Sequence, residues 1–408
     1  MRKRFDLKQH AVHTKEIFKV LNFVFNEGNY ADRAVEKIMR ANKKWGVRDR
    51  AFVAETVHDM ITNWRLLCTV ADINERLSER NYSDLLGVWL LFRDYELPDH
   101  RIFQRINPDK IKTKLEKYKK LRKVRESVPD WMDELCQKEL GTEWDKIIHA
   151  LNQKPVMFLR TNRLKTTREE LQKRLEEENV KTLPVHWVPD AIELQFSRNV
   201  FRTEAFREGL FEVQDTASQM VSDLLHVNPG MRVVDACSGT GGKSLHLASL
   251  MRNNGRIIAL DTKEWKLQEL KKRASRAGVN MIETRVIDSS KIIKRLENSA
   301  DRLLLDVPCS GLGVLRRNPD NKWKLQPDEI ERLKKVQQEI LEKFSGITKV
   351  NGKMVYATCS ILPSEGEKQI ELFLTLHGEK WKLIAEKRYS PAIQNCDGFY
   401  MALLERVK

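Results

Sequence analysis

The sequence predicts a protein of the α/β class. Its largest part forms a mixed seven-stranded sheet with an antiparallel last strand, preceded by a small α+β domain and an all-helical N-terminal domain. Residues 1–125 show helical periodicity with almost no strand signal, residues 126–225 mix short strands with helices, and residues 226–408 alternate between strands and helices. At 408 residues, the chain is long enough for three domains with separate cores.

The N-terminal domain is predicted to be a helical bundle. Between Arg48 and Leu67 the apolar residues recur at steps of three and four, which gives one apolar helix face. Another helix is expected to be capped by Ser83 or Asp84 and to end at Pro98. The domain ends in the basic run Lys110–Arg125, which holds nine Lys or Arg and a single acidic residue. Such a run suits either a solvated helix face or contacts with phosphates, and the sequence leaves both open.

The middle domain is predicted to be a small sheet, of the type seen in RNA-recognition motifs, covered by one or two helices. Strands are expected at Val156–Asn162, 191–196 and 210–215. A helix follows the first strand, with Thr166 or Thr167 as its N-cap and glutamates three residues further on.

The third domain is predicted to hold a mostly parallel sheet with helices on both faces. Strand patterns occur at 232–237, 256–261, 283–288, 302–308, 353–360, 381–386 and 399–406. The gap before the final strand is too short for a helical crossover, so that strand is expected to run antiparallel. Ligands of such sheets bind beyond the carboxyl ends of the strands, so the residues at those ends are the candidate site.

The first of these strand ends leads into a glycine-rich turn. Its last residues, Gly242-Lys243-Ser244, look like the end of a phosphate-binding P-loop. That motif would place a glycine where Cys237 stands, and Asp235 would repel a phosphate at the end of the strand. The turn therefore favours a nucleoside or dinucleotide ligand, which glycines allow the backbone to approach closely.

An aspartate ends each of the first four strands. Any single one is explained as a helix N-cap, but four in corresponding positions favour a nucleoside site. A carboxylate after the second strand suits ribose hydroxyls, and one after the third suits the amine of an adenine. These aspartates are Asp235, Asp261, Asp288 and Asp306.

Two cysteines follow the fourth and fifth strands. Cys309 and Cys359 would face one crevice if the first, fourth and fifth strands are neighbours. A lone cysteine is usually a small buried apolar residue, but each of these lies in a polar Cys-Ser turn where a thiol can be exposed and activated. The chain has six cysteines and no C-x-x-C pair, so the sequence predicts no disulfide framework, thioredoxin-like redox pair or metal site.

The overall charge indicates the partner. The net charge is +15 and the pI is near 9.4, which favours a polyanionic partner such as RNA. No signal-peptide core follows the basic first residues, and no apolar run reaches the ~18 residues that a membrane span needs. The sequence therefore predicts a cytoplasmic protein without membrane attachment, and we expect a monomer because no coiled-coil pattern is present.

These motifs together resemble those of the Sun/Fmu-type (RsmB-like) RNA 5-methylcytosine methyltransferases, which use S-adenosyl-L-methionine on a Rossmann-like class I fold. The resemblance rests on "DACSGTGGKS" (235–244), "DVPCSGLGVLRRNPD" (306–320) and "TCSILPSEGE" (358–367), supported by "FLRTNRLKTTREEL" (158–171) and "GLFEVQDTASQ" (209–219). The helical domain loosely resembles the RNA-binding domain of antitermination factors.

The resemblance implies a role for each motif residue. Cys359 would attack carbon 6 of cytosine, Cys309 would assist release of the methylated base, and Asp306 would bond the ring nitrogen. S-adenosylmethionine would lie over the glycine turn, whose Ser238-Gly239-Thr240 departs from the usual Ala-Ala-Pro of the family. The residues implied for cofactor binding are Cys237, Ser238, Gly239, Thr240, Gly241, Gly242, Lys243, Asp261, Asp288 and Asp306.

Other functions stay open at this point. Enzymes that methylate an amine have an aromatic residue at the position of Cys309. The cysteine at that position therefore disfavours amine methylation. DNA cytosine methyltransferases use the cysteine at the position of Cys309 as the nucleophile, and the presence of Cys359 favours the RNA class. The expected substrate is 16S or small-subunit ribosomal RNA (rRNA). Transfer RNA (tRNA), or a non-catalytic RNA-binding role on the same fold, are the alternatives.

Overall fold

The computed structural model describes residues 5–73, 78–196 and 199–408, and it divides into two compact units. The first unit comprises residues up to Gln153 together with Leu315–Pro327, and the second comprises Lys154–Val314 and Asp328–Lys408. The domain limits expected near residues 125 and 225 therefore differ from the unit limits. As limits of independently folding domains, they stay predictions.

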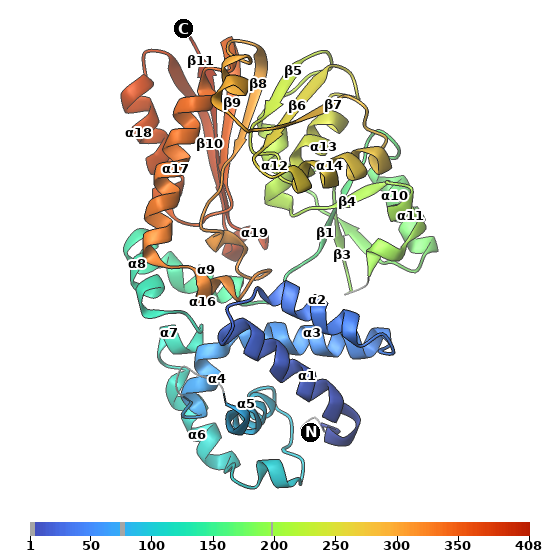
Figure 1. Ribbon diagram of the computed structural model, residues 1–408, viewed down its shortest axis with the longest axis vertical. Coiled ribbons are helices and arrows are strands. Elements are labelled where there is room, and N and C mark those ends of the chain that lie inside the picture. Colours follow the sequence, from blue (N-terminus) through green and yellow to red (C-terminus); the bar gives the residue numbers. More distant parts are fainter. Residues whose placement is uncertain (1–4, 74–77, 197–198) are drawn as a thin grey trace. The chain divides into compact units, whose positions relative to one another are not determined.

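The first unit is all-helical, as the periodicity predicts (Figure 1). The helix expected from Ser83 or Asp84 begins earlier, at Glu79, because Ser78 and Asn81 form the capping interaction. Its helices are α1 (Leu7–Phe25), α2 (Ala31–Ala41), α3 (Val47–Thr62), α4 (Trp64–Val70), α5 (Glu79–Phe92), α6 (Pro108–Tyr118), α7 (Arg122–Arg125), α8 (Asp130–Leu140), α9 (Glu143–Leu151) and α16 (Asn321–Lys324).

The segment Leu315–Pro327 joins this unit although it follows the Cys309 loop in sequence. Within the segment, Lys322 is fully buried and donates hydrogen bonds to Thr62 O at 2.8 Å and Asn152 Oδ1 at 3.0 Å. The indole of Trp323 donates to Ile61 O at 3.2 Å. These bonds replace the water that the polar groups lose on burial, and they fix the segment within the helical unit.

The charge state of Lys322 gives the first testable prediction. Burial lowers the pKa of Lys322 to about 7, from 10.5 in an exposed chain. Between these values the unfolded chain binds more protons than the folded one, so the free energy of unfolding should rise as the pH rises from about 7 to 10.5. We expect Lys322→Met to flatten this rise in urea unfolding measured at several pH values. If the free energy of unfolding of Lys322→Met rose with pH as steeply as that of the native chain, the prediction would be contradicted.

The basic run Lys110–Arg125 lies on α6 and α7, and most of its charges have acidic partners. Lys114 pairs with Asp72, while Arg122 pairs with Asp133 at 2.9 Å. Further pairs join Lys112 to Asp109, Lys119 to Glu116, Lys123 to Asp130 and Arg125 to Asp145. The run therefore provides fewer cations for phosphates than its sequence suggests.

The second unit begins with a small antiparallel sheet in the order β2-β3-β1-β4. Thr167 caps α10, and its side chain accepts a hydrogen bond from Glu170 N, as the capping pattern predicts. The elements are β1 (Phe158–Thr161), β2 (Thr182–Pro184), β3 (Ala191–Leu194) and β4 (Phe211–Val213), with α10 (Arg168–Glu177) and α11 (Glu204–Arg207).

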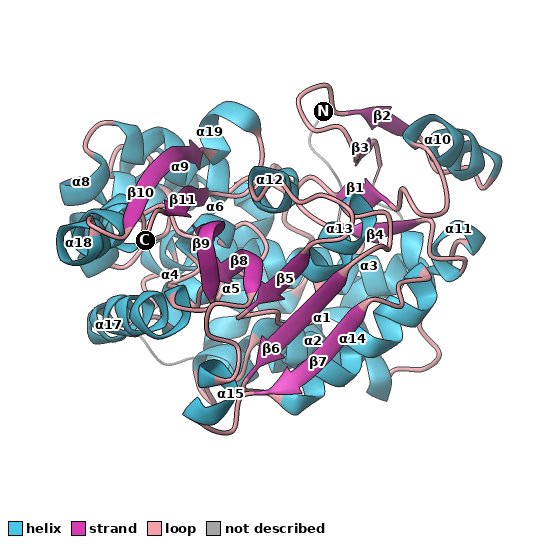
Figure 2. Cartoon of the chain, turned by 90° about the horizontal axis from the view of Figure 1, so that it is seen from above, coloured by secondary structure: helices cyan, strands magenta, loops and turns pink. Residues whose placement is uncertain are grey.

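A seven-stranded sheet forms the rest of this unit, in the order β10-β11-β9-β8-β5-β6-β7 (Figure 2). The prediction of an antiparallel last strand is confirmed, since β11 is antiparallel to both β9 and β10. The strands are β5 (Arg232–Asp235), β6 (Arg256–Asp261), β7 (Ile282–Val286), β8 (Ala300–Asp306), β9 (Thr348–Thr358), β10 (Trp381–Tyr389) and β11 (Phe399–Arg406).

Helices cover both faces of this sheet because successive strand residues point to opposite sides. Val233 and Ile257 pack into one apolar core, and Val234 and Ile258 into the other. The first core includes residues of α12 (Thr216–Leu224), α13 (Gly242–Leu250) and α14 (Glu264–Ala277). The second includes residues of α15 (Ser290–Lys294), α17 (Pro327–Ser345) and α18 (Glu367–His377); α19 (Pro391–Gln394) precedes the last strand.

Candidate active site

The sheet order brings together the strand ends that the sequence singles out. Strands β5, β8 and β9 are neighbours, with Asp235 beside Leu304 and Asp306 beside Ala357. Cys309 and Cys359 follow β8 and β9, and their Sγ atoms lie 3.2 Å apart. Both side chains are partly exposed. The two thiols therefore face each other at the carboxyl end of the sheet.

The pKa of one of these two thiols, that of Cys309, is strongly raised. The hydrogen bond with Cys359 and then burial raise the pKa of Cys309 well above its ordinary value, and the negative charge of Glu365 adds to the effect. Cys309 is therefore a protonated thiol at neutral pH, able to donate a hydrogen bond to the sulfur of Cys359.

Lys243, at the start of α13, connects the glycine turn to the end of β8. Its ammonium lies 2.7 Å from Asp306 Oδ2. Burial acts to lower the pKa of Lys243, but the charge of Asp306 and the hydrogen bond to it outweigh burial and raise the pKa. The ammonium thus stays charged and holds one oxygen of Asp306 in place.

The glycine turn between β5 and α13 has the backbone that its sequence requires. Gly239 and Gly241 have φ values of 55° and 88°, a region that residues with a Cβ rarely adopt. Asp261 Oδ2 accepts a hydrogen bond from Gly239 N at 3.0 Å, so the end of β6 shapes the turn. Asp235 is buried and accepts from Ser244 Oγ at 2.6 Å, and burial raises its pKa to about 7.

The residues around this turn fit a nucleoside-type methyl donor. A Cβ built on Gly239 would meet no atom within 4 Å, so the turn leaves room for a ligand against its backbone. Asp288 is exposed after β7, with Oδ1 accepting from the hydroxyl of Ser289 at 3.0 Å. Cys237 is less suited to reaction, since burial raises the pKa of its thiol strongly.

Two arginines that the sequence did not single out support the turn. Arg160, buried in β1, donates to Gly242 O at 2.6 Å. Arg273, on α14, donates to both Thr240 O and Thr240 Oγ1 at 2.9 Å and forms an ion pair with Glu212. Arg160 lies within the quoted stretch 158–171, but periodicity alone shows no contact with a turn some eighty residues later.

A matched pair of variants tests the role of Arg273. Arg273 and Arg276 both form ion pairs with Glu212, but only Arg273 has hydrogen bonds to Thr240. We expect Arg273→Ala to weaken S-adenosylmethionine binding by about tenfold, the effect of losing ~1.4 kcal/mol, because the turn loses its support. Arg276→Ala should bind nearly as the native chain does in titration calorimetry. Equal losses in both variants would contradict a role specific to the turn.

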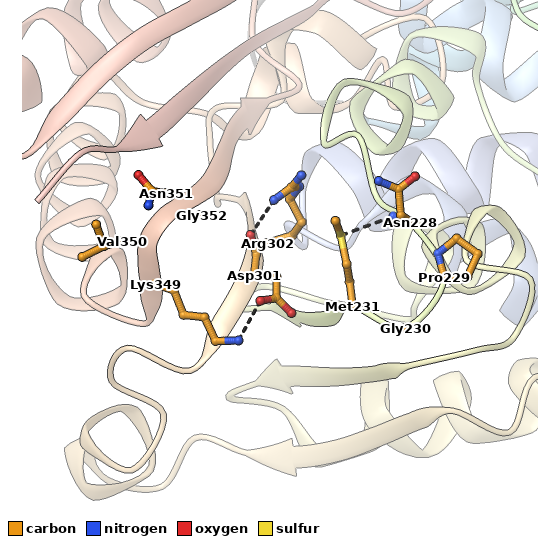
Figure 3. Close-up of a pocket in the computed structure, with 10 residues that line it drawn as sticks. All are labelled: Asn228, Pro229, Gly230, Met231, Asp301, Arg302, Lys349, Val350, Asn351 and Gly352. Atoms are coloured by element: carbon orange, nitrogen blue, oxygen red, sulfur yellow. Dashed lines mark hydrogen bonds and ion pairs between the residues drawn. The ribbon is translucent and has the colours of Figure 1, made fainter.

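A separate pocket lies at the other end of the sheet. In Figure 3, Asp301 and Lys349 form an ion pair at 2.7 Å, and Arg302 donates to the backbone oxygen of Asp301. The pocket residues precede β5 or lie near the starts of β8 and β9, away from the carboxyl ends that hold the cysteines. They are Asn228, Pro229, Gly230, Met231, Asp301, Arg302, Lys349, Val350, Asn351 and Gly352.

A seven-stranded sheet with an antiparallel last strand, and a glycine turn framed by the acids that end β5 and β6, define the class I S-adenosylmethionine-dependent methyltransferases. Comparison with known proteins adds the family. The family model described as "16S rRNA methyltransferase RsmB/F" matches residues 222–405, and a ferredoxin-like domain described as RsmF/B-like matches residues 128–201. The chain belongs to this RsmB/F methyltransferase family.

Individual relatives agree with this assignment. The chain is 31% identical over 400 residues to a probable ribosomal RNA small subunit methyltransferase B of Synechocystis sp., covering 90% of this chain and 89% of the relative. It is 36% identical to ribosomal RNA small subunit methyltransferase B of Yersinia enterocolitica, covering 68% of this chain and 66% of the relative. That alignment thus spans slightly less than two thirds of the Yersinia protein.

Solved structures show the same architecture. The crystal structure of PH0851 superposes with a TM-score of 0.82 and 25% identity, covering both chains completely. A methyltransferase homolog protein from Pyrococcus horikoshii gives a TM-score of 0.63 and 27% identity over 70% of this chain and 97% of that one.

Among the helices of the described residues, none is long and apolar enough to cross a membrane.

Proposed function

We propose that this protein methylates carbon 5 of a cytosine in small-subunit rRNA, with Cys359 as the nucleophile. The observation that carries the proposal is the pair of thiols 3.2 Å apart, in the loops that follow the neighbouring strands β8, which ends at Asp306, and β9. Relatives named as rRNA small subunit methyltransferases support rRNA as the substrate, and the net charge of +15 suits any RNA.

The thiol chemistry follows from the reactivity of cytosine. Carbon 5 is a poor nucleophile until a thiolate adds at carbon 6, which turns the ring into an enamine. Cys309 supports this step by donating a hydrogen bond to the sulfur of Cys359. Asp306, held by Lys243, faces the base and keeps a proton on the ring nitrogen as negative charge develops there.

S-adenosylmethionine supplies the electrophilic methyl group. We assign its amino-acid part to residues 237–243, its ribose to Asp261 and its adenine to Asp288, on the positions that these residues occupy at the strand ends. After methylation, water takes the proton from carbon 5, the electron pair of that C–H bond re-forms the double bond between carbons 5 and 6, and the sulfur leaves carbon 6 with the electron pair of the C–S bond. Cys309 is the group close enough to Cys359 to return a proton to the departing sulfur.

Transfer of a labelled methyl group tests this function. Deproteinised small-subunit rRNA and unmodified tRNA are offered separately to the full chain, and digestion to nucleosides identifies the methylated base. Label in 5-methylcytosine from rRNA is the expected result. Label only in tRNA would favour the tRNA alternative, and RNA binding without transfer would favour a non-catalytic factor. We place the reaction in the cytoplasm and propose a monomer, which light scattering of the native chain checks.

A further inference from the structure

The two cysteine turns, Cys309–Leu312 and Cys359–Leu362, repeat one pattern. Each reads Cys-Ser-x-Leu. In each turn the serine hydroxyl accepts a hydrogen bond from the backbone N–H two residues later, at 3.4 Å from Leu312 N and 3.1 Å from Leu362 N. The two turns therefore have the same local structure. For the two sulfurs to stay in contact, a further interaction must fix the distance between the turns.

A single carboxylate connects the two turns. The hydroxyls of Ser310 and Ser360 both donate hydrogen bonds to Glu365 Oε2. The bond from Ser360 is 2.6 Å long. The other oxygen, Oε1, accepts from Ser310 N at 2.8 Å and from Gln337 Nε2 at 3.0 Å. Glu365 thus receives hydrogen bonds from the residue that follows each cysteine.

Burial makes this connection rigid. Glu365, Ser360 and Gln337 are each 0% exposed, so water does not compete for the carboxylate. A buried carboxylate is unfavourable unless donors surround it, and four donors do so here. Gln337 also donates to Pro308 O at 3.1 Å, which extends the network to the residue before Cys309.

We propose that Glu365 is a positioning residue that holds the two cysteine turns at the separation needed for catalysis, an inference that rests on the proposed function of the thiol pair. Its carboxylate bonds to the turns, not to the reacting atoms. Its negative charge has a second effect, since it contributes to keeping the proton on Cys309.

Kinetics of three variants test this role. Glu365→Ala should lower kcat by about 10- to 100-fold, because reacting groups displaced by ~1 Å lose rates of this size. The KM for RNA and the Kd for S-adenosylmethionine should change by less than about twofold, since the glycine turn is untouched. Glu365→Gln, which can still accept from Ser310 N, should recover part of the rate. Ser360→Ala should show an intermediate loss.

Tyr356→Phe is the matched control. Tyr356 OH donates to the backbone oxygen of Glu365 at 2.9 Å, so the variant removes one buried hydrogen bond at the same residue and leaves both serine turns connected. We expect near-native kcat from it. Equal losses in Tyr356→Phe and Glu365→Ala would indicate a general loss of structure and would overturn the proposal.

A second readout needs neither RNA nor methyl transfer. In a glutathione redox buffer, the two thiols form a disulfide while oxidised glutathione is reduced to two glutathione molecules, and the equilibrium constant reports how closely the sulfurs are held. We expect Glu365→Ala to lower this constant by about tenfold and Tyr356→Phe to leave it unchanged, as measured by peptide mass spectrometry at pH 7.

The two readouts separate the two proposals. If the native chain fails to methylate cytosine, the proposed function is wrong, while the disulfide equilibrium still decides whether Glu365 holds the turns. If Glu365→Ala does not fold, Ser360→Ala gives the same comparison with only one of the four donors removed. The proposal would be overturned if Glu365→Ala had both a native equilibrium constant for the disulfide and a native kcat. If Glu365→Ala does not fold, the same result in Ser360→Ala would overturn it.

Discussion

Replacing Cys359 by alanine should abolish methyl transfer, with a loss of at least about 10³-fold in kcat. The reason is chemical, since carbon 5 of cytosine becomes nucleophilic only after a sulfur has added to carbon 6. The measurement is incorporation of a labelled methyl group into rRNA, with a denaturing gel to detect covalent protein–RNA complexes. Cys359→Ala should give neither label nor complex.

Two comparisons make this result specific. Cys359→Ala should bind S-adenosylmethionine with near-native Kd, because the glycine turn lies on a different strand end from Cys359. Cys396→Ala replaces a different, buried cysteine of the same unit and should keep substantial activity. Methylation by Cys359→Ala at a rate near that of the native chain would show that Cys309 is the nucleophile or that the chemistry is non-covalent.

Replacing Cys309 by alanine should have a different outcome, the accumulation of a covalent protein–RNA complex. Cys359 can still attack, but the thiol that lies 3.2 Å from its sulfur, and that retains a proton because its pKa is raised, is missing when the adduct must break. We expect turnover to fall by at least about 10²-fold, while a band of slow mobility appears on a denaturing gel within one turnover.

The double variant supplies the control for that band. Cys309→Ala combined with Cys359→Ala should form no complex, because the attacking sulfur is gone. Persistence of the band in the double variant would place the covalent bond at another residue. Normal turnover by Cys309→Ala would show that Cys309 has no role in the release step. Its raised pKa would then have no catalytic consequence.

The sequence alone determined the catalytic sheet and the residues at its strand ends. Strand and helix periods are local properties, so all seven predicted strands are present. Their ends differ from the predicted ones, as in β9, which begins at Thr348 and not at residue 353, and in β7, which ends at Val286, two residues before Asp288. The sequence predicted that Cys309 and Cys359 would face one crevice if the first, fourth and fifth strands were neighbours, and the sheet order meets that condition. The predicted cap of helix α5, Ser83 or Asp84, was wrong because another possible cap, Ser78, lies a few residues earlier, and the helix begins at Glu79.

Only the tertiary structure decided which distant side chains support that site. Leu315–Pro327 belongs to the helical unit because Lys322 finds its hydrogen-bond partners there. Arg160 and Glu365 gain their roles from partners fixed by strand register and packing, which no local period encodes. A buried charge acquires a function through the donors or acceptors that surround it, and these come together only when the chain has folded.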